Sequence, residues 1–194
     1  MRSKIAVVLA AAAALSPCFA QADGLSYSYL DLAYVNTDID GVDEDLDGFG
    51  LRGSLEVADN IFLFAGYADQ SASVFGSDID YQAYDIGGGY AWSFAPAADV
   101  YGRIAYVKAE LDFPGGDVDD DGYSLGVGMR GRGAQQFELE GALNYVDFSD
   151  GGDDTSLGLG ARWYFTDQLA LGVEGEFGDD ADTYGIGGRW TVAP

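Results

Sequence analysis

The chain of 194 residues has no histidine and only nine basic residues, against 33 acidic ones. The absence of histidine excludes hydrolases that pair a serine or aspartate with a histidine base. The formal net charge of −24 excludes nucleic acid as a partner, because its binding depends on neutralising phosphates. No zinc ligand set and no phosphate-binding loop occurs. The sequence therefore predicts no enzymatic activity and no cofactor.

Cysteine and long apolar runs are equally scarce. A basic start, an apolar run over 5–15 and the small-residue end Ala20-Gln21-Ala22 are typical of a secretory signal peptide. The apolar run is too short for a membrane-spanning helix, which needs about 20 residues. We therefore predict a cleaved signal over 1–22 and one domain over 23–194. The only cysteine, Cys18, falls in the predicted signal, so we expect no disulfide.

Glycine and aromatic residues are abundant and alternate regularly. In Ser156–Phe165 the odd positions are all apolar and end in Trp163 and Phe165, whereas the even positions are mostly small or polar and include Arg162. Alternate side chains of a strand point to opposite faces. This stretch therefore predicts a strand with lipid on one face and a polar lumen on the other.

Similar alternation recurs about ten times along the chain. The strands are expected at 27–35, 49–57, 61–67, 84–92, 100–106, 123–130, 137–145, 156–165, 169–177 and 184–192. We predict an all-β fold, a closed antiparallel up-and-down transmembrane β-barrel of about ten strands, with eight as the alternative. A secreted soluble β-sandwich would also alternate, but it would not need aromatic residues near its strand ends.

Long acidic segments and short turns alternate between the predicted strands. The acidic segments, expected to be loops, are 36–48, 72–80, 112–121, 149–154 and 178–182. Outer-membrane barrels have short periplasmic turns and longer external loops. We therefore expect the protein in the outer membrane of a gram-negative cell, with both chain ends in the periplasm and acidic loops on the cell surface.

Charged residues concentrate on the faces predicted to line the lumen. They are Asp31, Arg52, Glu56, Asp85, Arg103, Arg130, Glu138, Glu140, Arg162, Glu174, Glu176 and Arg189. A narrow barrel is largely filled by side chains, and unpaired buried charges are costly, so we expect these groups to pair and block the lumen. The inward glycines leave room either for long side chains or for water. The predicted function is thus a non-enzymatic surface role, with a narrow pore for small solutes or cations as the alternative.

Two acidic segments contain the pattern Asp-x-Asp-x-Asp-Gly, which begins an EF-hand calcium loop. The candidate metal ligands are Asp43, Asp45, Asp47, Asp117, Asp119 and Asp121. Position 12 of such a loop should be a bidentate glutamate, but Ser54 and Gly128 stand there. We therefore predict solvated acidic segments with no metal, or at most a weak divalent-ion site.

Two short stretches, Ala22–Tyr29 and Phe64–Tyr67, resemble a family of small gram-negative outer-membrane proteins. The family is described as regulated by diffusible signal factor and is similar in build to OmpX-like and OmpA-type barrels. The resemblance implies a barrel without established catalytic residues. The partners expected of such a protein are outer-membrane lipid and lipopolysaccharide, periplasmic chaperones and the barrel-assembly machinery, and we expect a monomer.

Overall fold

The computed structural model describes residues 25–41, 44–74, 77–133 and 136–192, and in these ranges the chain forms ten strands. The strands are β1 (Tyr29–Ile39), β2 (Leu46–Ala58), β3 (Ile61–Val74), β4 (Ser77–Ala95), β5 (Ala98–Phe113), β6 (Gly116–Gly133), β7 (Phe137–Phe148), β8 (Gly152–Tyr164), β9 (Leu169–Phe177) and β10 (Ala181–Thr191). The predicted signal peptide lies outside the described residues, as does Asp43. None of the described residues belongs to a helix that is long and apolar enough to cross a membrane.

Every strand pairs antiparallel with its neighbours in the chain, and β1 pairs with β10 to close the barrel. This closing pair runs in register from Tyr29 opposite Thr191 to Ile39 opposite Ala181. The closed ladder confirms the predicted fold class and its ten strands, and the eight-stranded alternative is wrong. A closed ladder also leaves no unpaired strand edge, which a bilayer would not tolerate.

The outer surface of the barrel is apolar, as the alternation predicts. Leu32 is 58% exposed, Ile86 64% and Trp92 68%, values that no core residue of a soluble sandwich would have. Leu157 has the same outward parity but is buried, since Leu143 and Phe177 flank it in the register. The apolar faces therefore do not meet in a core, and lipid must cover them.

Aromatic side chains form two bands around the barrel. We call one the hairpin-side girdle; it holds Tyr34, Phe49, Tyr67, Tyr84, Tyr106, Tyr123, Tyr145, Phe177 and Tyr184. The other, the turn-side girdle, holds Trp92, Phe94, Phe137, Trp163, Phe165 and Trp190. Rings on paired strands touch, with centroids 5.0 Å apart for Tyr67 and Tyr84. The two bands mark the edges of the lipid-facing region.

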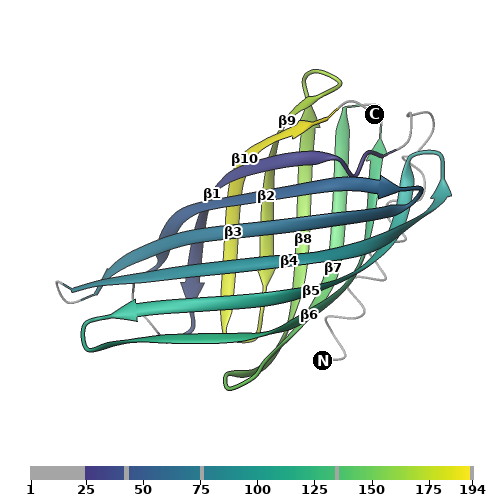
Figure 1. Cartoon of the computed structure of the whole chain (residues 1–194). Coiled ribbons are helices and arrows are strands. Elements are labelled where there is room, and N and C mark those ends of the chain that lie inside the picture. The colour runs from purple at the N-terminus through teal and green to yellow at the C-terminus, as the bar shows by residue number, and fades with distance from the viewer. Residues whose placement is uncertain (1–24, 42–43, 75–76, 134–135, 193–194) are drawn as a thin grey trace.

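Four short turns and both ends of the described chain lie at one end of the barrel, the turn end; the five hairpins lie at the other, the hairpin end. There the structure corrects the prediction, because most of 72–80 and 112–121 is strand rather than loop. β4 has 19 residues and β9 only nine. The hairpins β3–β4 and β5–β6 therefore project past the girdle, on the left of Figure 1. By strand rise and tilt, the projection is on the order of 20 Å.

Inward glycines make room for long side chains that lean across the neighbouring strand. A Cβ atom would lie less than 3.0 Å from such a side chain at Gly66, Gly89, Gly126, Gly128, Gly172 and Gly185. At Gly128, for example, it would lie 2.6 Å from the Tyr101 hydroxyl. At Gly50 and Gly160 the nearest atoms are 3.6 and 3.7 Å away. The first set of glycines accommodates side chains, whereas at the second set a Cβ atom would make only ordinary van der Waals contacts.

Candidate functional site

Glu138 on β7 lies at the centre of the lumen near the turn end, and its side chain is 0% exposed. Four guanidinium groups donate to its carboxylate: Arg130 at 3.1 Å, Arg132 at 3.3 Å, Arg162 at 3.3 Å and Arg189 at 3.1 Å. These arginines come from β6, β8 and β10, so one carboxylate ties three strands together. Hydrogen bonds between ionised groups are stronger than neutral ones.

Two further carboxylates, Asp31 and Glu140, offset part of the remaining positive charge around this centre. Arg189 binds Asp31 in a bidentate manner at 2.7 and 2.6 Å. Arg162 donates to Glu140 at 2.8 Å, and the Tyr101 hydroxyl donates to the same Glu140 at 2.6 Å. Because buried charges are costly unless paired, these contacts stabilise an arrangement that would otherwise be unfavourable.

Aromatic rings fill the remaining width of the lumen at this level. Tyr27, just before β1, stacks on Phe62 with centroids 4.6 Å apart, and Tyr101 meets both rings edge-on. The Arg132 guanidinium lies 3.8 Å from the Tyr164 ring centroid, a favourable cation–π position. We call these rings, together with the charged groups around Glu138, the plug. The four rings are buried, as are Glu138, Arg130, Arg162 and Arg189, so they leave little room for water at this level of the barrel.

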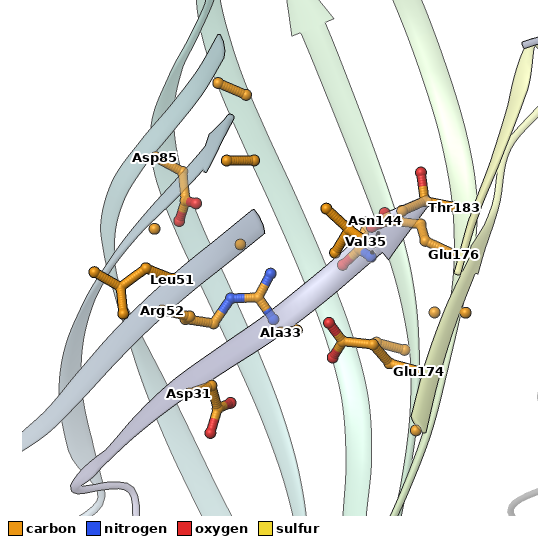
Figure 2. Close-up of a pocket in the computed structure, with 18 of the residues that line it drawn as sticks. Asp31, Ala33, Val35, Leu51, Arg52, Asp85, Asn144, Glu174, Glu176 and Thr183 are labelled. Atoms are coloured by element: carbon orange, nitrogen blue, oxygen red, sulfur yellow. Dashed lines mark hydrogen bonds between the residues drawn. The ribbon is translucent and has the colours of Figure 1, made fainter. Parts of the chain in front are cut away.

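Above the plug the lumen opens into a cavity of about 330 Å³, which we call the cup. Figure 2 shows Arg52 projecting into it, with Asp31, Asp85 and Glu174 around the guanidinium. None of these three carboxylates forms a direct ion pair with Arg52 among the described residues. Arg103 instead donates to Asn144 at 2.9 Å. A second cavity of about 330 Å³, the mouth, shares part of the cup's lining and continues toward the hairpin end.

The structure brings some of the predicted lumen charges together and leaves others apart. Asp31, Arg130, Glu138, Glu140, Arg162 and Arg189 meet in the plug. Arg52, Asp85, Arg103, Glu174 and Glu176 line the cup, and only Glu174 approaches an arginine of the plug, Arg162 at 3.8 Å. Glu56 is exposed next to a β-bulge near the turn end and belongs to neither group.

Arg132 and Tyr164 belong to the plug, but the sequence analysis did not assign them to it. Arg132 lies just beyond the strand predicted at 123–130, whereas β6 runs through Gly133. Arg132 lies two residues after the inward-facing Arg130, and this spacing alone indicates that it also faces the lumen. Tyr164 likewise shares the parity of Arg162 in a strand whose pattern was clear.

The candidate metal ligands do not converge. Asp117, Asp119 and Asp121 lie on β6, an extended strand, where residues two apart are about 6.6 Å apart along one face. Asp45 and Asp47 both accept hydrogen bonds from the amide of Asn36. In the described parts of the chain, no group of three acidic side chains is placed to hold a metal ion.

A family profile and one solved structure agree with this architecture, and two further solved structures are similar at lower scores. The profile of the family "Outer membrane protein beta-barrel domain" matches residues 5–188. The NanC porin superposes with a TM-score of 0.56 at 9% identity, covering 84% of this chain and 100% of NanC. Ail of Yersinia pestis, in complex with the heparin analogue sucrose octasulfate, has a TM-score of 0.47 at 13% identity over 84% of this chain and 95% of Ail. Neisserial surface protein A has a TM-score of 0.40 at 13% identity, covering 86% of this chain and 98% of that protein. No curated protein sequence matches significantly.

Proposed function

Because this chain belongs to the outer-membrane β-barrel domain family and lies in the outer membrane, we propose that it acts at the cell surface without conducting solutes. In this proposal the lumen is open to the outside of the cell through the mouth and is closed toward the periplasm by the plug. The short turns and the chain ends mark the periplasmic side, as in other outer-membrane barrels. The projecting hairpins β3–β4 and β5–β6, with their outward acidic residues, are then exposed to the medium outside the cell.

The observation that carries the proposal is the burial of Glu138 under four arginines. A group that is 0% exposed has no water beside it, and the arginines around it span the lumen. Opening the plug would separate Glu138 from its arginines and leave uncompensated buried charges, at a cost of several kcal/mol. Thermal motion alone will therefore seldom open the plug.

We also propose that the protein is not an enzyme. The cup contains carboxylates, guanidiniums and an amide, but no histidine or cysteine that could serve as nucleophile or base near neutral pH. Its closed ladder supports a monomer. Its proposed partners are outer-membrane lipid and lipopolysaccharide, and chaperones and the barrel-assembly machinery during export. The stretches Ala22–Tyr29 and Phe64–Tyr67 support placing it among the barrels regulated by diffusible signal factor.

Planar-bilayer recordings of the purified protein test the closed lumen. We expect little or no steady conductance from the unmodified barrel. Arg162→Ala or Arg189→Ala should raise the conductance, because each removes a side chain that contacts both Glu138 and a second carboxylate of the plug. Arg103→Ala is the matched control. It removes an inward arginine of the cup, outside the plug, and should leave the conductance unchanged.

A narrow pore for small solutes or cations is the second candidate. The three inward carboxylates Asp85, Glu174 and Glu176 favour it, since they would attract cations into the lumen. Large, stable, cation-selective channels in the unmodified protein would refute the closed cup and establish the pore. Increased conductance in Arg103→Ala alone would place the barrier in the cup instead of the plug.

A further inference from the structure

Inward-facing side chains change character at the hairpin-side girdle. Below it, the inward positions of β4, β5 and β7 are polar, charged or small, apart from Tyr101 in the plug. Above it, the same parity carries Tyr81, Ala83, Val107, Ala109, Val146 and Phe148. The outward positions change in the opposite sense, from apolar residues to Lys108, Glu110 and Asp112. The projecting strands thus expose acidic groups outward and present an apolar wall to the mouth.

The other wall of the mouth, which faces β4 and β5 and adjoins β7, is polar. It is formed by β8, β9 and β10, and it contributes Asp154, Ser156, Glu176 and Thr183. The mouth therefore has one apolar side and one hydrogen-bonding side across a single cavity. Its volume of about 330 Å³ suits one small organic molecule. Such a cavity fits a ligand that is itself apolar at one end and polar at the other.

The charges at this level leave a carboxylate free for a ligand. Glu176 accepts hydrogen bonds from the Asn144 amide at 3.1 Å and from the Ser156 hydroxyl, both neutral donors. Among the described residues no arginine or lysine forms an ion pair with it. Lys108 borders the mouth but donates to Glu110, which raises the pKa of Lys108, and it lies 3.6 Å from Asp119. Lys108 is therefore already bound to carboxylates of the outer face.

Arg52 and Arg103 line both the cup and the mouth, but neither forms an ion pair with Glu176. Arg103 is held by Asn144 and lies 5.7 Å from the ring centroid of Phe64. Arg52 is surrounded by Asp31, Asp85 and Glu174, whose charges oppose its own. The strongly negative charge of the whole chain adds to the attraction for cations. The mouth alone is lined by three basic groups and three carboxylates, but the mouth and the cup together are lined by six carboxylates and four basic groups. An anionic ligand would meet this excess of carboxylates, whereas a cation would find Glu176 available.

We propose that the mouth binds a small organic cation with an apolar arm, such as a primary amine carrying an aromatic or short aliphatic group. The ammonium group is held by Glu176, and the arm packs against the wall that contains Val107, Val146 and Phe148. This inference deepens the proposed surface function and rests on it. It concerns only the mouth, so binding can be measured whether or not the plug conducts.

Three probes with the same phenyl group separate the contributions. Phenethylamine carries the cation, phenylacetate an anion and 2-phenylethanol no charge. With the protein in nanodiscs of zwitterionic lipid and empty nanodiscs as blank, calorimetry should give phenethylamine an affinity at least tenfold higher than either other probe. Equal or tighter binding of phenylacetate would overturn the proposal, because the guanidiniums would then dominate. Equal binding of 2-phenylethanol, or no binding of the amine, would also overturn it.

Variants then locate the site. Glu176→Gln should weaken phenethylamine binding about tenfold while keeping the side-chain shape, and Val146→Ser should weaken it several-fold. Asp112→Asn is the matched control, because it removes one negative charge from the outer face and should leave the affinity unchanged. An equal loss in Asp112→Asn and Glu176→Gln would overturn the site in favour of general attraction. Each variant is first checked for its folded mobility on unboiled gels. Conductance in bilayers with intact amine binding would overturn the closed lumen alone.

Discussion

At some inward glycines a neighbouring side chain occupies the space that a Cβ atom would need, whereas at others the space for a Cβ atom is free. Substitution by alanine should therefore change the free energy of unfolding differently at the two kinds of position. In Gly128→Ala the new Cβ would meet the Tyr101 hydroxyl at 2.6 Å and the Gly141 carbonyl oxygen at 2.9 Å. We expect a loss of about 1–3 kcal/mol in the free energy of unfolding, the usual cost of overpacking.

Gly160→Ala is the matched control, since its Cβ meets nothing closer than 3.7 Å. It should be neutral or slightly stabilising, because alanine restricts the unfolded chain more than glycine does. Urea titration in lipid vesicles, followed by gel mobility without boiling, measures both variants. Equal stability of the two would show that Tyr101 does not lean over Gly128 in the membrane.

Strand parity was enough to predict that arginines and acids such as Arg130 and Glu138 face inward, because charge on the lipid face is costly. It could not predict their partners. Side chains lean across one or two strands, as Arg189 does in reaching both Asp31 and Glu138. That lean depends on which neighbouring inward residues are glycine, and this requires the register between strands.

Strand β5 crosses the hairpin-side girdle, so its outward face carries apolar residues within the lipid-facing region and charged residues beyond it. Ile104 is 58% exposed within the lipid-facing region, and Asp112 lies near the tip of the projecting hairpin. Ile104→Arg should lower the folded yield strongly, at a cost of about 2–4 kcal/mol near the bilayer midplane. Asp112→Arg, with the same new side chain on the same face, should fold normally.

Folding yield into lipid vesicles, read from the heat-dependent mobility shift, compares these two variants. Because strand, face and substituent are shared, the difference isolates depth in the bilayer. Similar yields would mean that the hairpin-side girdle at Tyr106 does not mark the lipid boundary.

The sequence predicted the middles of all ten strands but not their ends. In 112–121, five aspartates and two glycines suggested a loop, yet the backbone continues as a ladder with Asp112 opposite Asp117. An outward aspartate above the lipid stands in water and does not break strand pairing. Apolar residues at inward positions, such as Val107 and Leu111, mark the extension, because above the lipid the inward face becomes apolar and the outward face polar.

The whole molecule is polarised, with its projecting hairpins and most of its acids at one end. Asp117→Cys in β6 and Asp167→Cys in the β8–β9 turn should report this orientation in intact cells. A membrane-impermeant maleimide should label Asp117→Cys directly, and Asp167→Cys only after the outer membrane is permeabilised.

Labelling is interpretable because the sequence contains no cysteine other than Cys18, which lies in the predicted signal peptide. The reverse labelling pattern would mean that the barrel has the opposite orientation and that its mouth faces the periplasm. Labelling of both positions in intact cells would argue against insertion as a sealed barrel.

The pairing of β1 with β10 has a consequence for biogenesis. Every other strand pair joins neighbours in the chain, whereas this seam joins Tyr29 to Thr191, almost the full length apart. Contacts between distant parts of a chain form slowly, so the seam should close last. Until the final strand has been exported, the sheet keeps two open edges, which must be shielded from other chains. The barrel can therefore be completed only after the whole polypeptide has crossed the inner membrane.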